Sequence, residues 1–169
     1  MKKLFLSLVI LWGGISMAEY NTLDFNFDKG GVDIQYEELS QPYELSFTLP
    51  SECSESKIKI SDESHSISVH HEGEQCNSGA HFLLKINQSF DALVSIDAGA
   101  ITVRNINRTL ERLATLRASV EAGALSTSTT ELEAKRTSSY AGSYVDFSNI
   151  KNPNGHNLKL KVKAGAMSL

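Results

Sequence analysis

Apolar and polar residues alternate along most of the chain, which is the pattern of β-strands with one buried face. The alternation covers residues 43–49, 58–69 and 82–86, and the second of these ranges contains a polar turn at 62–65 that predicts a hairpin. A helical period is found only near residues 107–113, where Asn107 is suited to cap one or two turns. These patterns predict an all-β fold with one short helix.

Four segments of the second half share a core of small residues and predict an internal repeat. They read "IDAGAITV", "VEAGALST", "YAGSYVDF" and "VKAGAMSL", and their glycines are separated by 24, 19 and 23 residues. Repeats of this length are typical of solenoids, propellers and arrays. The third copy lacks the flanking alternation of the others, and a fainter copy, "FNFDKGGVDI", surrounds Gly30. The expected corner glycines are Gly99, Gly123, Gly142 and Gly165.

The apolar positions change parity across each glycine. In the first copy Ile96 and Ala98 alternate before Gly99, whereas Ile101 and Val103 alternate after it. Successive side chains of a strand point to opposite faces, so a change of parity requires a bend, and glycine accepts the dihedral angles of a bend. Each copy is therefore expected to form a strand, a corner and a second strand, with the apolar side chains facing one interior.

Repeats of about 23 residues with small-residue corners predict a β-solenoid, similar to a single-stranded β-helix, in which each coil pairs with the next. The "AGA" corner with its flanking alternation resembles the bacterial auto-transporter adhesin head domains, the GIN domain group, and related adhesin-like β-strand-repeat domains. The resemblance covers residues 92–169 well and 20–91 poorly. It implies an exported β-solenoid with an adhesion or envelope role, and it supplies no catalytic residues.

The first eighteen residues, "MKKLFLSLVILWGGISMA", have the form of a secretory signal peptide, with cleavage expected after Ala18. The apolar run from Leu4 to Trp12 is shorter than the roughly 20 residues that a membrane-spanning helix needs, and no later segment meets that requirement. The expected mature chain, 19–169, is one domain with a less regular β portion at 19–91 and a repeat portion at 92–169.

Charge and cysteine usage refine this picture. The formal charge is −4, and cleavage removes two lysines and no acids, which argues against a nucleic-acid binder because phosphate binding depends on clustered Lys and Arg. Export predicts one disulfide between Cys53 and Cys76. It would either staple the open end of the 58–69 hairpin or join adjacent coils, since the two cysteines are 23 residues apart, as repeat copies are.

Histidines gather in "HSISVHHEGEQCNSGAH" with Cys76, and imidazole with thiolate is a ligand set for zinc or copper. The spacing matches no compact metal-site signature, and two adjacent histidines of a strand point to opposite faces. A solvated hairpin end whose cysteine is oxidised is the preferred interpretation of the group, so no metal or cofactor is predicted. The candidate ligands are His65, His70, His71 and His81.

Two further groups suggest chemistry on the outer face. Asp97 and Glu121 each precede their glycine by two residues, so adjacent coils would bring them within about 5 Å, the separation of a retaining glycosidase pair or a calcium ledge. Four arginines accompany a single acid in "RNINRTLERLATLR" and form a candidate site for an anionic glycan or a lipid headgroup, because guanidinium groups pair with carboxylate and phosphate. These are Arg104, Arg108, Arg112 and Arg117; for both groups a solvated surface is the alternative interpretation.

The sequence therefore predicts an exported, non-enzymatic, adhesin-like or envelope-associated module located in the periplasm or at the cell surface. No nucleophile motif, phosphate loop or dinucleotide fingerprint is present. The alternative is a small periplasmic carbohydrate-active or metal-dependent enzyme. The apolar stretch from Lys161 to Leu169 is expected to form an unpaired strand edge, which would pair with a second copy or a protein partner.

Overall fold

A computed structural model describes residues 22–50, 57–63, 66–72, 80–133, 135–136 and 142–169. The expected signal peptide, both cysteines and His65 lie outside these ranges, so cleavage after Ala18 and the Cys53–Cys76 disulfide stay predictions.

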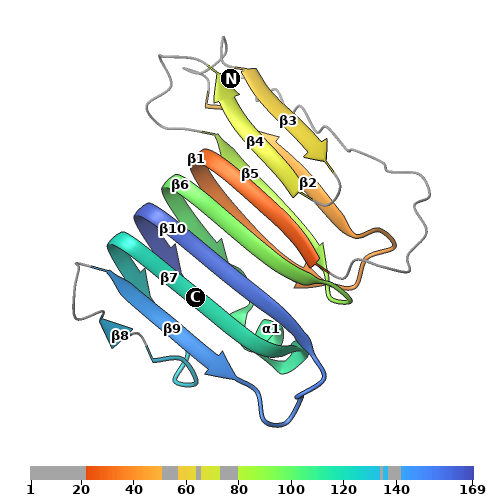
Figure 1. Cartoon of the computed structure of the whole chain (residues 1–169), viewed down its shortest axis with the longest axis vertical. Helices are drawn as coiled ribbons and strands as arrows, with labels where there is room; N and C mark the ends of the chain where they lie inside the picture. Colours follow the sequence, from red (N-terminus) through yellow and green to blue (C-terminus); the bar gives the residue numbers. More distant parts are fainter. Residues whose placement is uncertain (1–21, 51–56, 64–65, 73–79, 134, 137–141) are drawn as a thin grey trace.

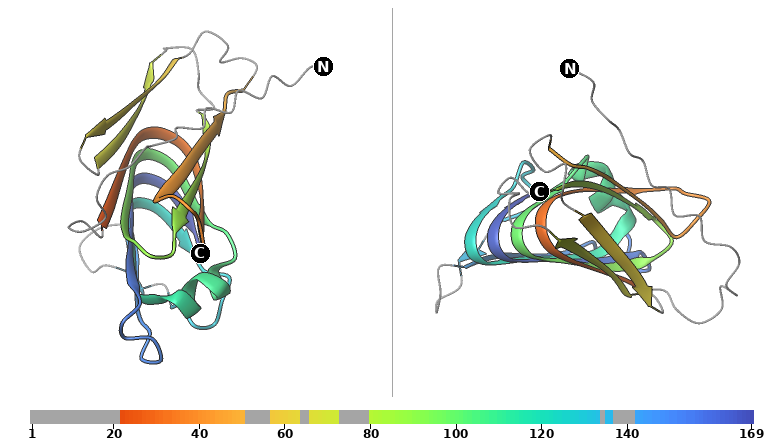
Figure 2. Two further views of the ribbon diagram at one scale, coloured as in Figure 1. Left: turned by 90° about the vertical axis from the view of Figure 1, so that its right-hand side faces the viewer. Right: turned by 90° about the horizontal axis from the view of Figure 1, so that it is seen from above.

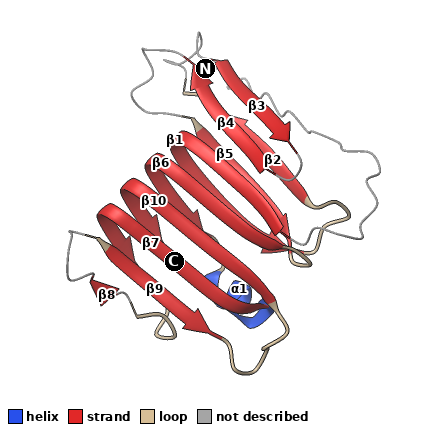
Figure 3. Ribbon diagram, viewed as in Figure 1, coloured by secondary structure: helices blue, strands red, loops and turns tan. Residues whose placement is uncertain are grey.

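The described chain is all-β with one short helix, as the sequence pattern predicts (Figures 1 and 3). The predicted hairpin is present, with Ile60 opposite Val69 in its antiparallel ladder. The elements are β1 (Thr22–Glu37), β2 (Tyr43–Thr48), β3 (Lys57–Glu63), β4 (Ser66–Glu72), β5 (His81–Asn87), β6 (Asp91–Val103), α1 (Ile106–Arg112), β7 (Leu113–Ser126), β8 (Lys135–Arg136), β9 (Ser143–Ser148) and β10 (His156–Ser168).

Four long parallel strands form the centre of the molecule, in the spatial order β1, β6, β10, β7. Each strand bends sharply, so the stack forms an arch with two walls (Figure 2). The first wall contains the halves before the bend, flanked by β4 and β3 on one side and by β9 and β8 on the other. The second wall contains the halves after the bend, flanked by β5 and β2 beside β1.

Glycines occupy the bends and stack directly on one another. Gly30, Gly99, Gly165 and Gly123 pair in register across the four strands, with φ between 125° and 146°. A Cβ atom built on Gly99, Gly123 or Gly165 would lie 1.7–1.8 Å from the carbonyl oxygen of the glycine on the neighbouring strand. Only glycine fits this close backbone approach. Gly142 does not belong to the stack, because it precedes β9, which runs antiparallel to β7.

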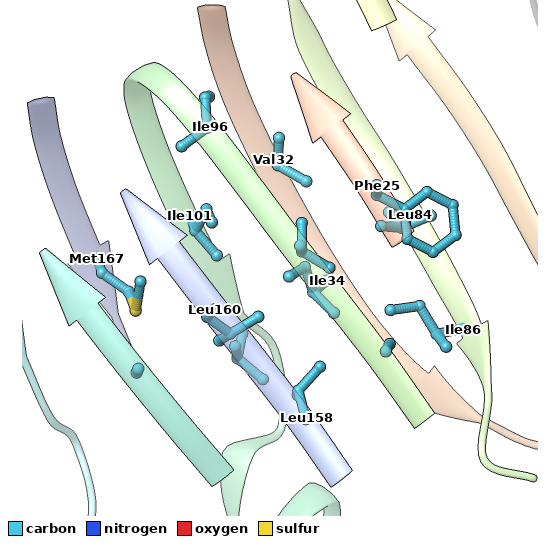
Figure 4. Packing of buried hydrophobic residues seen from close by; sticks show 14 of the residues in the cluster. Phe25, Val32, Ile34, Leu84, Ile86, Ile96, Ile101, Leu158, Leu160 and Met167 are labelled. Carbon is cyan, nitrogen blue, oxygen red and sulfur yellow. The ribbon is translucent and has the colours of Figure 1, made fainter. Parts of the chain in front are cut away.

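The two walls share one apolar core (Figure 4). Ile96 before the bend and Ile101 after it are both buried, which is the parity change expected from the sequence. Ala98 is exposed although its parity matches that of Ile96, because it lies at the outside of the bend. The largest fully buried side chains include Phe25 and Phe82, which come from β1 and β5.

The stack does not have the order that a β-solenoid requires. A solenoid adds coils in sequence order, whereas β10 lies between β6 and β7 and pairs with both in parallel. The sheet does not close into coils, so the fold is an all-β arch with a mixed sheet. The expectation of an unpaired edge at Lys161 to Leu169 is wrong, because residues 158–168 pair with β6 on one side and β7 on the other.

Polar side chains connect the starts of the central strands. The Asp91 carboxylate accepts hydrogen bonds from the Asn157 backbone and side-chain nitrogens at 2.8 and 3.0 Å and lies 3.1 Å from His156 Nδ1. Thr115 Oγ1 lies 2.6 Å from Asn157 Oδ1. This row of contacts spans β6, β10 and β7, so it helps to fix their register.

The helix α1 lies at the open end of the arch and connects the second wall to the first (Figure 2). The helix begins at Ile106, and its N-cap is Asn105 rather than the expected Asn107. Asn105 adopts the left-handed backbone conformation, with φ 55° and ψ 47°. Side-chain amides of the β9–β10 loop cover its last carbonyls: Asn149 donates to Leu110 at 2.9 Å and Asn152 to Arg112 at 3.0 Å. Within the described ranges, no helix has the length and apolar character needed to span a bilayer.

Candidate functional site

Two adjoining hollows open on the surface where β6 passes into α1. Their volumes are about 460 Å³ and about 150 Å³, and both are lined by Asn105 and Arg108. We call them the larger and the smaller rim hollow. The larger is completed by Val103, Ile106, Asn107 and Ser128, and the smaller by Gln35, Tyr36, Glu37, Arg104 and Thr109.

Arg104 is held at the smaller rim hollow by an acid of the neighbouring strand. Its Nε donates to Asp33 Oδ2 at 2.9 Å, and its Nη2 donates to the same oxygen. Asp33 is only 9% exposed, so the pair is largely shielded from water on the acid's side. His81 Nε2 lies 3.8 Å from the same carboxylate oxygen. A guanidinium group has five donor hydrogens, so Arg104 keeps donors for a further partner.

Arg108 is exposed on α1, and no ion pair involves it among the residues that the structure describes. The acid of the same hollow, Glu37, lies 3.3 Å from Lys85 Nζ. Burial acts to lower the pKa of Lys85, but hydrogen bonds to Glu37 and Glu44 outweigh it and raise that pKa, so Lys85 is charged at neutral pH. The single charge of Lys85 is shared between Glu37 and Glu44, whose carboxylates lie 3.3 and 3.4 Å from its Nζ.

Two neutral polar residues complete the smaller rim hollow. Thr109 is 2% exposed and is a buried residue of the lining. Asn105 occupies the N-cap position of α1 without a side-chain capping bond, so its amide is available to the hollows.

The four predicted arginines do not form one site. Arg104 and Arg108 meet at the rim hollows, whereas Arg117 lies on the first wall, with its Nε 3.5 Å from Asp146 Oδ1. The Nη1 atom of Arg112 is buried and has no hydrogen-bond partner within the described part of the chain. The expected four-arginine cluster is therefore reduced to two residues.

The other sequence candidates are separated by the fold. His70 lies on β4 of the first wall and His81 on β5 of the second, and His71 is also a residue of β4. Across the described residues no group of three or more His, Cys, Asp or Glu side chains is placed to hold a metal ion.

Asp97 and Glu121 are not neighbours, because β10 intervenes between their strands. Two strand spacings of about 4.8 Å place them roughly 10 Å apart, beyond the 5 Å of a retaining pair. Each carboxylate also binds a lysine at 2.7 Å, Asp97 with Lys163 and Glu121 with Lys161. These contacts do not favour the expected catalytic pair or calcium ledge.

No protein-family model matches the chain, and neither does any curated protein. Among solved structures, a candidate cell adhesion protein from Clostridium sporogenes aligns with a TM-score of 0.32 at 9% identity, over 89% of this chain and 92% of that one. A candidate adhesin from Parabacteroides distasonis aligns with a TM-score of 0.33 at 17% identity, over 90% of this chain and 53% of that one. The chain thus spans about half the length of the second protein. Similarity at this level does not establish a shared function, which has to rest on the residues themselves.

Proposed function

We propose that the chain is an exported, non-enzymatic, adhesin-like or envelope-associated binding module, built on a solenoid-like stack of bent strands of the adhesin head type. The observation that carries the proposal is where the molecule has room for a ligand. The space between the walls is filled by apolar side chains, and two hollows of the described chain lie on the outer rim. A partner would therefore contact the outer surface.

The outer faces suit such contacts because they are polar and held rigidly. On the first wall, Lys161 and Lys163 of β10 point outward, each bound to an acid of a neighbouring strand. On the second wall, Asp33, Arg104 and Lys85 make similar cross-strand contacts. The parallel strands pair along their whole length and lie roughly 4.8 Å apart, so the backbone holds each outward side chain at a fixed position on the surface. Fixed side chains lose little entropy when they bind.

Adhesion of beads coated with the purified chain tests the proposal. We expect saturable binding to bacterial or epithelial cell surfaces, and soluble chain should compete with it. Beads coated with bovine serum albumin serve as the control for non-specific contact. The proposal fails if the coated beads bind no more than these control beads on every surface tested.

Export is tested separately by N-terminal sequencing of the protein from the periplasmic and culture fractions. The expected first residue is Glu19, which follows the predicted cleavage site. Recovery of the uncleaved chain in the cytoplasmic fraction alone would contradict export.

A further inference from the structure

We propose that the end of β7 after the bend, with the two residues that follow it, is a strand-addition site for an extended, uncharged segment of another polypeptide. We call residues 122–128 the β7 edge. This inference rests on the proposed binding function and names the kind of partner that the module takes. It is carried by the strand pairing, by the side chains of the exposed edges and by the unequal lengths of the two walls.

The β7 edge is paired on one side only within the described chain. Residues 122–126 pair in parallel with residues 164–168 of β10. On the other side of β7, β9 pairs only with residues 115–120, before the bend. Residues 129–133, which lead towards β8, form turns and no strand. A ladder partner for the second side is thus absent from the described ranges.

Leu125 and Thr127 define the free side of the β7 edge. Ser126 accepts from the Leu169 nitrogen at 3.0 Å, and Ser128 donates to the Leu169 carbonyl at 2.6 Å, so both serines face β10. The backbone N–H and C=O groups of alternate residues point to opposite sides of a strand, so those of Leu125 and Thr127 point away from β10. An extended partner can pair with these groups through main-chain hydrogen bonds, as in β-strand addition.

Side chains at the β7 edge are less covered than their equivalents on the inner strands. Ile101, Met167 and Leu125 lie in one row across β6, β10 and β7. Ile101 and Met167 are 0% and 2% exposed, whereas Leu125 is only partly buried. Gly123 is exposed, whereas Gly165 beside it in the stack is partly buried. The apolar row and the glycine stack therefore both end at a side of β7 that no described strand covers.

The β7 edge also lacks the protection that the other exposed edges of the described chain have. Native edge strands are kept from pairing with other chains by charged side chains, by proline or by being short. Four of the seven residues of β3 are charged, β2 is flanked by Pro42 and Pro50, and β8 has two residues. The β7 edge reads "AGALSTS", with neither charge nor proline. Such an edge is a template for a further strand, and its neutral side chains favour an uncharged partner.

The unequal walls decide which partner fits. Beyond β7 the first wall continues with β9 and β8, whereas no described strand continues the second wall (Figure 1). At about 4.8 Å per strand, the first wall overhangs the β7 edge by roughly 10 Å. A second copy that extended the second wall with its apolar face on the same side would place its own first wall in the space of this overhang.

The size of the β7 edge also argues against a second copy. Stable complexes use about 20–30 residues on each side, whereas the edge has seven. An extended segment one or two strands wide fits beside β7 without a conflict with the overhang. The partner is therefore a strand-like segment and not another arch.

Amide hydrogen exchange of the full chain, measured by NMR, tests the inference. The probe is the capped peptide AGAMSL, the sequence of residues 164–169, which is uncharged and whose native copy pairs with the opposite side of β7. We expect exchange at Leu125 and Thr127 to slow about tenfold at a peptide concentration about ten times the dissociation constant. Exchange in residues 92–96, which are paired on both sides, should stay unchanged. No slowing at millimolar peptide, or equal slowing in both regions, would overturn the inference.

Two controls locate the contact. The same peptide with every backbone nitrogen methylated has no donor for a ladder and should leave exchange unchanged. Thr127→Pro removes an N–H from the free side and none from the β10 ladder, so it should weaken peptide binding severalfold, read at Leu125, and leave the unfolding midpoint nearly unchanged. Thr127→Val keeps the N–H and should bind as the unchanged chain does. Slowing by the methylated peptide, or full binding by Thr127→Pro, contradicts the assignment.

The bead assay separates this inference from the proposed function. Beads that adhere to cells although the peptide slows no exchange remove the strand-addition site and leave the binding module. Peptide binding at Leu125 by a chain whose beads adhere to nothing supports the site and removes the adhesin-like function.

Discussion

The stacked glycine corners make a sharp prediction for Gly99→Ala. A Cβ atom at this position would lie 1.8 Å from the Gly30 carbonyl oxygen, whereas real Cβ atoms essentially never approach closer than 3.0 Å. The two strands would have to separate locally by about 1.2 Å. The conflict cannot be relieved by rotating a side chain, because the Cβ atom is fixed by the backbone of residue 99 and the oxygen belongs to the backbone of Gly30. The residue also has φ 146°, a region that side chains rarely adopt. The substitution therefore combines steric conflict with backbone strain.

The expected loss of stability is about 2–5 kcal/mol. Backbone strain of this kind costs about 1–3 kcal/mol, and one or two disturbed ladder hydrogen bonds add about 1 kcal/mol each. Urea unfolding followed by circular dichroism measures the change. With a slope of about 2 kcal/mol per M, a loss of 4 kcal/mol lowers the midpoint by about 2 M.

Gly31→Ala is the matched control, because Gly31 is the next residue along the chain from Gly30. Its added Cβ would meet the His81 ring at 3.4 Å, an ordinary contact, and its φ lies outside the left-handed range. We expect a change within about 1 kcal/mol, which can be stabilising because alanine restricts the unfolded chain. A midpoint for Gly99→Ala that matches the one for Gly31→Ala would refute the claim that the close stack requires glycine.

Three further predictions concern the polar row, the core and a buried phenol. Burial acts to raise the pKa of Asp91, but hydrogen bonds from Asn157 outweigh it and lower that pKa, so the stabilisation is present above about pH 4 and is lost as the pH falls through the folded value. Asp91→Asn should thus cost about 1–2 kcal/mol at pH 7 and progressively less as the pH is lowered below about 4 in urea unfolding, and a cost that does not fall with pH would contradict this. Leu160→Ala should cost about 2–5 kcal/mol because Leu160 is fully buried, whereas Ile150→Ser, at a residue 90% exposed, should change the unfolding midpoint little. Burial, with a smaller effect of the Asp91 charge, raises the pKa of Tyr36. The contribution of the neutral phenol to stability is therefore complete below about pH 10 and is lost only as the pH rises through the folded pKa. At about pH 11, ultraviolet absorbance should show that one fewer tyrosine ionises on unfolding in Tyr36→Phe than in the unchanged protein.

The bends were predictable from the sequence, and the order of the strands was not. The parity change around Gly99 identifies a bend because it reflects which side chains of one strand can share an interior. The order of strands depends on contacts between copies, and the copies around Gly123 and Gly165 offer nearly the same apolar positions to a neighbour. The apolar pattern therefore allows either copy to pair with β6. Only the connections of the folded chain place β10 between the other two.

The candidate site shows the same limit for side chains on outer faces. Arg104 belongs to an arginine-rich segment and was identified for that reason, but its partner Asp33 lies 71 residues away in an ordinary alternating strand. Thr109 was missed because a single threonine in a short helix gives no signal of burial. A pattern of alternation shows which residues face outward and does not show which outward residues meet.

The central position of β10 determines when the molecule can complete its fold. Its 13 residues follow both β6 and β7 in the chain, yet they form a ladder with each of these strands. Until they arrive, β6 and β7 each lack a native neighbour, and such long-range pairing is slow even in a complete chain. The part of the stack that contains β1 and β6 and the part that contains β7 and β9 can therefore join only after β10 has been synthesised.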